Sequence, residues 1–361
     1  MSKTEYEKNA GRERVIPVYV LAGFLGSGKT TLLARLLQQA EAEGLKAAVV
    51  MNEIGDVNLD GLEVGEGVAM AEMLSGCICC TVRGDLGVEI MRLVNEHRPD
   101  VVYVECTGAA NPLELLDGVT EASLLLRAEL KGIVTVMDAA QLLAAHEKGK
   151  GQTYRLMKDQ LRAASLIVLN KIDLISEEER IACHVLIEEW NGHARVLDTV
   201  RCEFDLSLVS SLNEPIAMGP EAEHDQQGHD HDHHDHQCHD HDNHDHQGHD
   251  LDQSHDRSHR HAHHSHDHVM VYTHYMDGPV DSERFEQFMN ELPNEIYRAK
   301  GILTFTDTSS RFMFQYAYRQ LDCMRITPQR EVPDVAVFIG EHFDREELRR
   351  RLEELEAHSA V

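Results

Sequence analysis

The sequence has no long apolar run and no apolar segment near its start. No stretch reaches the ~18 consecutive apolar residues that a membrane-spanning helix needs, and residues 1–14 are polar and of mixed charge. A secretory leader requires an apolar core at that place, so neither secretion nor membrane spanning is indicated. We therefore expect a cytoplasmic protein.

Basic residues are also scarce. The 361-residue chain has 34 Lys and Arg against 63 Asp and Glu, which gives a formal net charge of −29. A protein that binds nucleic acid through its phosphates presents a basic surface, so the balance argues against that class. Acidic proteins favour cationic partners, including metal ions.

The eight cysteines do not indicate a disulfide framework. In a reducing compartment they are better explained as thiols or metal ligands. Three of them form a cluster and Cys238 lies in a histidine-rich segment. The other four are isolated, and we expect them to be small core residues: Cys106, Cys183, Cys202 and Cys323.

Short apolar runs alternate with helical periodicity over residues 15–215. This alternation predicts an α/β domain with a mostly parallel sheet. Residues 269–361 predict a smaller α+β domain, with residues 1–14 as a tail and 216–268 as a linker. Predicted strands are 16–22, 47–51, 101–105, 132–136, 166–169, 270–275, 301–306, 312–318 and 335–339; predicted helices are 31–40, 88–96, 282–292 and 345–356.

The most informative motif is a glycine-rich loop between an apolar strand and an amphipathic stretch. Residues 18–31 have the sequence VYVLAGFLGSGKTT. In this setting backbone N–H groups can converge on phosphates, Lys29 can reach the β- and γ-phosphates, and the Thr30 hydroxyl can ligate Mg²⁺. We predict a nucleotide-phosphate site formed by Gly23, Gly26, Ser27, Gly28, Lys29, Thr30 and Thr31.

A second motif, Asn170-Lys171-Ile172-Asp173, follows the apolar run 166–169. An aspartate at the end of a strand can accept hydrogen bonds from N1–H and the exocyclic amine of guanine, and Asn170 offers a donor to O6 or N7. Adenine lacks that pair of donors and would leave the carboxylate unpaired. Downstream of a P-loop the motif therefore favours GTP, with Asn170, Lys171 and Asp173 in the base site.

Glu105 ends the apolar strand 101–105, and Gly108 follows it closely. A carboxylate in this place can hold Mg²⁺ or its water, and the Gly108 N–H can sense the γ-phosphate. The alternative is an ordinary glutamate at the edge of a sheet. We expect Lys29, Thr30, Asp56 and Glu105 to serve GTP hydrolysis.

Cys77, Cys79 and Cys80 fall within four positions. The spacing is too short for a zinc ribbon, but three thiolates suit Zn²⁺ and leave a fourth tetrahedral position open. Glu53 and Asp56 are candidate fourth ligands, or they position Mg²⁺ or the attacking water. Redox chemistry is the alternative interpretation of the cluster.

Residues 224–268 contain 18 of the 25 histidines and 11 aspartates, partly in a ten-residue repeat. With so few apolar residues this segment cannot offset its ordering entropy, so a disordered linker is predicted. It is a candidate auxiliary metal store, and the alternative is a solvated spacer. The auxiliary ligands that we predict are His229, His231, His233, His239, His241 and His244.

Together these motifs resemble the CobW family of metallochaperone GTPases, which belong to the same broad class as the UreG and HypB nickel-insertion GTPases. The resemblance covers nearly the whole chain; Gly76-Cys-Ile-Cys-Cys80 is its most specific element, and Arg298-Ala-Lys-Gly301 and Val337-Phe-Ile-Gly340 belong to it in the last domain. It implies a GTPase that carries zinc, or in some branches cobalt or iron, on the cysteine motif. It also implies release to a client protein during GTP hydrolysis and a GTP-dependent homodimer. Gly108-Ala109-Ala110 departs mildly from the Gly-Leu-Ala that the family often has.

Three functions fit these motifs: metal delivery, metal storage or buffering, and cobalt handling in corrinoid synthesis. Cysteine ligation and the many imidazoles favour Zn²⁺, with Co²⁺ as the alternative. The sequence does not identify the client. It also assigns no arginine finger, which is worth about 10³ to 10⁵ in rate, so hydrolysis without a partner is expected to be slow.

Overall fold

The computed structural model describes residues 14–52, 68–72, 82–106, 108, 112–212 and 269–357. Within these ranges, no helix combines the length and the apolar character that crossing a bilayer requires.

The described residues of the first domain form a sheet of seven parallel strands, in the order β3-β2-β4-β1-β5-β6-β7. β4 and β6 are buried over their whole lengths, as expected for parallel strands covered on both faces. The strands are β1 (Ile16–Ala22), β2 (Ala47–Asn52), β3 (Ala69–Glu72), β4 (Val101–Cys106), β5 (Ala128–Asp138), β6 (Leu166–Asn170) and β7 (Arg195–Thr199).

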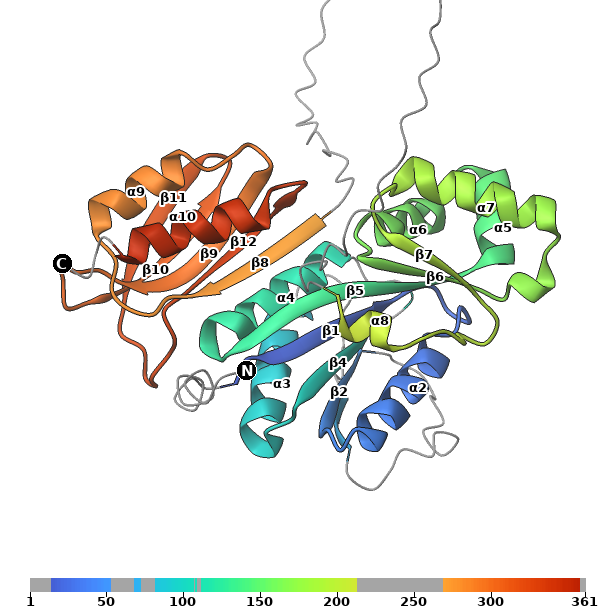
Figure 1. Ribbon diagram of the computed structural model, residues 1–361, viewed down its shortest axis with the longest axis horizontal. Helices are drawn as coiled ribbons and strands as arrows, with labels where there is room; N and C mark the ends of the chain where they lie inside the picture. Colours follow the sequence, from blue (N-terminus) through green and yellow to red (C-terminus); the bar gives the residue numbers. More distant parts are fainter. Residues whose placement is uncertain are drawn as a thin grey trace, which may run out of the picture. The chain divides into compact units, whose positions relative to one another are not determined.

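Helices cover both faces of this sheet (Figure 1). Successive residues of β1 point to opposite sides: Val18 and Val20 share a core with α3 and α4, whereas Tyr19 and Leu21 share one with α2. The helices are α2 (Lys29–Ala42), α3 (Val82–His97), α4 (Pro112–Leu125), α5 (Ala139–Lys148), α6 (Gln152–Arg162), α7 (Glu177–Trp190) and α8 (Ser207–Ser210), with a 3₁₀ turn η2 (Ile172–Leu174).

The second domain has a five-stranded antiparallel sheet in the order β11-β10-β9-β12-β8. Phenylalanines of this sheet and of α9 form a core on one face together with leucines of α10, and Val335 and Val337 contribute to the core that contains α4. The predicted parallel α/β domain and smaller α+β domain are confirmed. The elements are β8 (Val269–Tyr275), α9 (Ser282–Asn290), β9 (Ile296–Thr304), β10 (Arg311–Ala317), β11 (Gln320–Ile326), β12 (Val335–Glu341) and α10 (Arg345–Ala357).

The isolated cysteines divide into two groups. Cys106, Cys183 and Cys202 are buried as predicted. Burial raises the pKa of all three thiols, to about 11 for Cys183 and Cys202, so they are neutral at pH 7. The expectation that Cys323 is a core residue is wrong: it is exposed, because β11 is an edge strand with few buried side chains.

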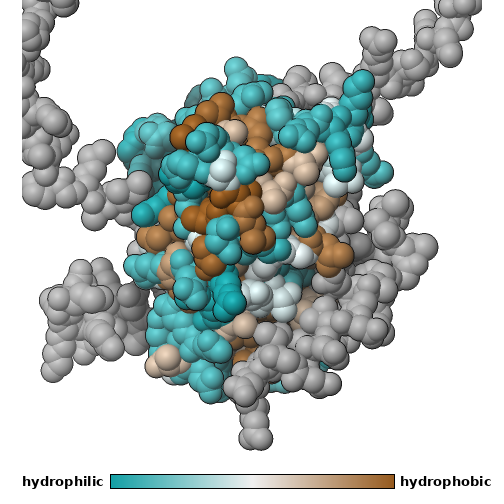
Figure 2. Space-filling model, turned by 90° about the vertical axis from the view of Figure 1, so that its right-hand side faces the viewer, coloured by the Kyte–Doolittle hydropathy of each residue, from teal (hydrophilic) through white to brown (hydrophobic). Residues whose placement is uncertain are grey.

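Apolar side chains gather among polar ones on the face of the molecule in Figure 2. The large apolar residues that are exposed in the described part include Leu174 of η2 and Ile181 and Val185 of α7. Ile181 and Val185 are four positions apart and therefore lie on one side of the helix. The opposite side of α7 packs Leu186 and Ile187 into a core. This helix thus presents apolar side chains both to a core and to solvent.

Gly301 lies where β9 packs closely against its neighbours. A Cβ there would be 2.2 Å from Cε1 of Phe314 and 2.3 Å from the carbonyl oxygen of Val335. We expect Gly301→Ala to destabilise the protein by about 1–3 kcal/mol through overpacking, lowering the midpoint of thermal unfolding. Gly278→Ala is the matched control, because a Cβ there meets nothing within 4 Å. Equal midpoints for the two variants would refute this expectation.

Candidate functional site

The loop between β1 and α2 has the backbone of an anion site. Gly23, Gly26 and Gly28 have φ values of 134°, 77° and 117°, a region that L residues rarely adopt. A Cβ on Gly23 would also be 2.1 Å from the carbonyl oxygen of Val136. Gly28 is the N-cap of α2, so the loop ends at a helix N-terminus, where backbone N–H groups and the helix dipole favour a phosphate.

The first residues of α2 carry two predicted functional side chains. Lys29 is buried and its Nζ donates to the carbonyl oxygen of Phe24 at 3.2 Å, so the ammonium lies along the loop. Thr30 Oγ1 donates to Glu105 Oε1 at 2.8 Å, and Glu105 is only 1% exposed. The parallel register places Glu105 opposite Leu21, the penultimate residue of β1, and this pairing brings hydroxyl and carboxylate together. The neighbouring Thr31 is exposed.

Gly108 lies against the phosphate loop. A Cβ on it would be 2.8 Å from the backbone nitrogen of Leu25. Gln160 of α6, which is 1% exposed, donates from Nε2 to the carbonyl oxygen of Gly108 at 3.2 Å, and Thr135 Oγ1 donates to the carbonyl oxygen of Gln160 at 2.9 Å. Sequence reasoning missed Gln160, because one glutamine in an amphipathic helix carries no signal. This contact ties the segment after β4 to α6.

Asn170 joins the guanine motif to the phosphate loop. Its side chain is buried, and Nδ2 donates to the carbonyl oxygen of Ser27 at 2.8 Å. Its Oδ1 accepts from the backbone nitrogen of Cys202 at 3.0 Å and from Thr199 Oγ1 at 3.1 Å. Cys202 in turn donates from Sγ to the carbonyl oxygen of Gly28 at 3.5 Å. Asn170 therefore holds together the loop, its own strand and the turn after β7.

The other two residues of the motif lie nearer the surface. Lys171 has a φ of 61° and its Nζ is 2.8 Å from Asp138 Oδ2. Asp138 also caps α5, because its Oδ1 accepts from the backbone nitrogen of Gln141 at 3.0 Å. Asp173 is exposed on η2. Asp138 was not predicted, although it is a carboxylate at the end of a parallel strand, the signal that identified Glu105.

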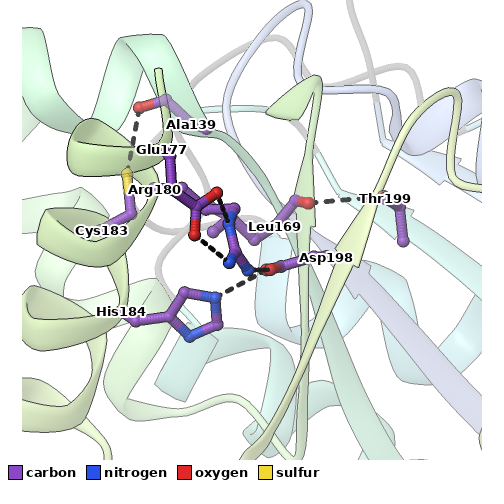
Figure 3. A network of polar contacts seen from close by, with 8 residues as sticks. All are labelled: Ala139, Leu169, Glu177, Arg180, Cys183, His184, Asp198 and Thr199. Carbon is purple, nitrogen blue, oxygen red and sulfur yellow. Dashed lines mark hydrogen bonds and ion pairs between the residues drawn. The ribbon is translucent and has the colours of Figure 1, made fainter. Parts of the chain in front are cut away.

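A polar network behind the motif fixes α7 to β7 (Figure 3). Arg180 Nη1 is 2.5 Å from Asp198 Oδ2, and His184 Nε2 is 2.8 Å from Asp198 Oδ1. Arg180 also donates from Nε to Glu177 Oε2 at 2.9 Å, and this guanidinium lowers the pKa of the Glu177 carboxyl. Since Asp198 pairs with Leu169 in the sheet, the network steadies β7 beside the strand that ends in the guanine motif.

The residues predicted to hold the zinc cargo and the auxiliary store lie outside the described residues, so the structure places none of them. Within the described ranges, no group of three or more His, Cys, Asp or Glu side chains is arranged to hold a metal ion. The unplaced residues are Glu53, Asp56, Cys77, Cys79, Cys80, His229, His231, His233, His239, His241 and His244.

Two described strands end shortly before Glu53 and Cys77 in the sequence. Met51 of β2 is opposite Glu72 of β3 and Glu105 of β4. β2 ends at Asn52, one residue before Glu53, and β3 ends at Glu72, five positions before Cys77. Because parallel strands end at a common edge, the ends of β2 and β3 lie on the side of the sheet where Glu105 and the phosphate loop lie.

Two family models match this sequence. Residues 17–198 match the model described as CobW/HypB/UreG, nucleotide-binding domain. Residues 270–356 match the Cobalamin synthesis protein cobW C-terminal domain.

Several known proteins are similar to the chain. The Zinc-regulated GTPase metalloprotein activator 1 of Dictyostelium discoideum is 36% identical over 217 residues, 50% of this chain and 45% of that protein. The Zinc chaperone CobW of a Sinorhizobium species is 36% identical over 186 residues, 44% of this chain and 52% of that protein. The chain thus spans about half the length of these curated relatives. A crystal structure of Zn(II)-bound YjiA GTPase from E. coli has 22% identity, covering 95% of this chain and 99% of that chain, with a TM-score of 0.45.

Proposed function

The chain belongs to the CobW/HypB/UreG family, and from that premise we propose that it is a GTP-hydrolysing metallochaperone that transfers zinc to a client protein. The nucleotide-binding part of this proposal rests on the 2.8 Å hydrogen bond from Asn170 to the carbonyl oxygen of Ser27. This bond joins the guanine motif and the phosphate loop into one site. Relatives that share 36% identity are named a zinc chaperone and a zinc-regulated activator, which supports zinc as the cargo.

In this proposal GTP binds along the edge where the parallel strands end. The Asp173 carboxylate accepts hydrogen bonds from the guanine N1–H and exocyclic amine. Backbone N–H groups from Gly26 to Thr30 and the Lys29 ammonium bind the phosphates. Lys171 supports the base site through Asp138, whose carboxylate both contacts its ammonium and caps α5.

The donors at Thr30 and Glu105 fit Mg²⁺. A hydroxyl and a nearly completely buried carboxylate, 2.8 Å apart, are hard oxygen ligands of the kind that this ion prefers. Thr30 would hold Mg²⁺ directly, and Glu105 would hold it or its water. When bound, the ion supplies neutralisation of the phosphate charge that develops during transfer.

Hydrolysis in this proposal depends on charge stabilisation and positioning by the chain itself. Lys29 stabilises negative charge between the β- and γ-phosphates, and the Gly108 N–H senses the γ-phosphate. Asp56 is proposed to position the attacking water. Loss of the γ-phosphate removes its contact with the Gly108 N–H, so Gly108 loses one of the interactions that hold it in place.

We place the zinc cargo on Cys77, Cys79 and Cys80, with Glu53 as the proposed fourth ligand. Support comes from the sheet register, since β2 and β3 end at the edge where Glu105 lies. In this proposal a change around the γ-phosphate therefore acts on the segments that follow β2 and β3, which contain Glu53 and the three cysteines. The histidine-rich segment is proposed as an auxiliary store that keeps weakly held ions at high effective concentration.

Replacing all three motif cysteines with serine tests the transfer proposal. We expect the wild-type protein to bind one zinc ion tightly, with an affinity that differs at least about fivefold between a non-hydrolysable GTP analogue and GDP. The triple variant should lose this tight site and its nucleotide dependence, because serine does not supply thiolates. Titration against a chromophoric chelator measures both quantities.

Cys323→Ser is the matched control, because this thiol is exposed and isolated. It should bind zinc like the wild type, while all variants keep the weaker capacity of the histidines. Equal zinc affinities with the GTP analogue and GDP would show that zinc binding is not coupled to the nucleotide. Unchanged tight binding in the triple variant would favour storage on the histidines, and tighter binding of Co²⁺ than of Zn²⁺ would favour cobalt handling.

A further inference from the structure

Two basic residues of β9 contact one acidic residue of α4. Arg298 Nη1 is 2.6 Å from Asp117 Oδ1, and Lys300 Nζ donates to the carbonyl oxygen of Asp117 at 3.1 Å. Lys300 Nζ is also 3.9 Å from Glu121 Oε1, one helical turn further along α4. Because strand side chains alternate, Arg298 and Lys300 point to the same face of the sheet, toward the helix.

In each ion pair one partner is buried and the other is exposed to a large extent: the side chains of Arg298 and Glu121 are 41% and 46% exposed. Lys300 and Asp117 are each 5% exposed. The buried Lys300 ammonium and Asp117 carboxylate have lost most of their contact with water, so each depends on the partners named above. On the opposite face of β9, Gly301 allows Phe314 and β12 to pack closely, so the strand that carries the basic pair has little room to shift. Arg298 and Lys300 therefore connect α4 to a strand that has little freedom to move.

The second domain also holds the far end of α4. Tyr275 Oη donates to the carbonyl oxygens of Leu126 and Ala128, at 3.2 and 3.0 Å. The Arg127 guanidinium lies over the Tyr275 ring, 4.9 Å from its centroid. Contacts from β8 and β9 thus hold α4 at its middle and just beyond its C-terminal end.

The other end of α4 leads to the nucleotide site. The helix begins at Pro112, four positions after Gly108. Gly108 packs on the backbone of Leu25 in the phosphate loop and accepts a hydrogen bond from Gln160. A displacement of Gly108 therefore acts on the start of a helix whose middle and far end are attached to the second domain.

From this arrangement we infer that Arg298 and Lys300 are positioning residues, which couple the γ-phosphate state at Gly108 to the second domain through α4. The inference rests on the proposed GTPase function and adds a route by which the nucleotide regulates the C-terminal sheet. Coupling is reciprocal, so a partner or change at the C-terminal sheet alters the preference for GTP over GDP by the same factor.

The double variant Arg298→Gln/Lys300→Met in the full-length chain tests this route. It removes both charges and keeps most of the side-chain volume. We expect its Kd for GDP to stay within about twofold of wild type, while the ratio of affinities for a non-hydrolysable GTP analogue and GDP changes at least about fivefold. In hydrogen exchange, the wild type should show a difference in β9 and β12 between the two nucleotides, and the variant should lose it.

Arg351→Gln is the matched control, because Arg351 Nη2 pairs with Glu291 Oε2 at 3.1 Å within the second domain. Its affinity ratio and exchange difference should equal those of wild type. If the double variant does not fold by circular dichroism, Asp117→Asn takes its place with the same measurements. An unchanged ratio and a retained exchange difference in the variant overturn the inference while the GTPase proposal stands. A wild-type chain that binds neither nucleotide refutes the proposed function itself.

Discussion

Replacing Asp173 with Asn is expected to lower the affinity for GTP by about 10²- to 10⁴-fold, since two charge-assisted hydrogen bonds worth ~1.5–3 kcal/mol each are lost. The new amide would also direct a donor at the donors of guanine. Xanthosine triphosphate has a carbonyl in place of the exocyclic amine, so its base matches Asn and its affinity should rise. Competition with a fluorescent nucleotide measures both Kd values.

Asp159→Asn is the control for this experiment, because Asp159 is an exposed aspartate on α6. It should bind GTP as the wild type does. A GTP affinity within twofold of wild type in the Asp173 variant would exclude this carboxylate from the base site. Tight ATP binding by the wild type would exclude the guanine assignment altogether.

The Lys29→Met variant is expected to hydrolyse GTP about 10²- to 10³-fold more slowly, the usual effect of removing one electrostatic stabiliser of the transition state. Methionine has a similar length and is uncharged, so the buried site beside Phe24 stays filled. Phosphate release under saturating GTP measures this loss, and circular dichroism checks the fold.

Lys148→Met is the matched control, because Lys148 is exposed at the end of α5. Its turnover should equal that of wild type. If the Lys29 variant retains wild-type turnover, the ammonium does not stabilise the transferring phosphoryl group, and the glycine loop binds phosphate without a catalytic lysine.

The phosphate loop and the guanine motif could be predicted because their signals are local. Glycines at 23, 26 and 28 are needed for positive φ angles, and the apolar strand before them and the helix after them are continuous in the sequence. Glu105 was found in the same way, as a carboxylate at the end of an apolar run. In each case a few adjacent residues carry the information, and the parallel sheet gathers them at one edge.

Features that depend on tertiary neighbours could not be predicted. Gln160 reaches Gly108 across 52 positions, and no local pattern distinguishes it from other helical glutamines. The edge strand β11 has mostly exposed side chains and lacks a clear apolar alternation, so neither the strand nor the exposure of Cys323 was expected. β9 begins at Ile296, before the predicted start at residue 301, because two basic residues interrupt the apolar run: Lys300 is buried against α4 and Arg298 pairs with Asp117 there.

The shared core around α4 bears on how the histidine-rich segment can change over evolution. Leu212 packs against the core that contains α2, and Val269 lies in the core that contains α4, so both ends of the intervening chain are held by packing. For a chain between fixed ends, each doubling of length costs only about 0.6 kcal/mol in closure entropy. Ten-residue repeats can therefore be gained or lost at little expense in stability. The number of imidazoles in this protein can therefore change while the nucleotide site stays as it is.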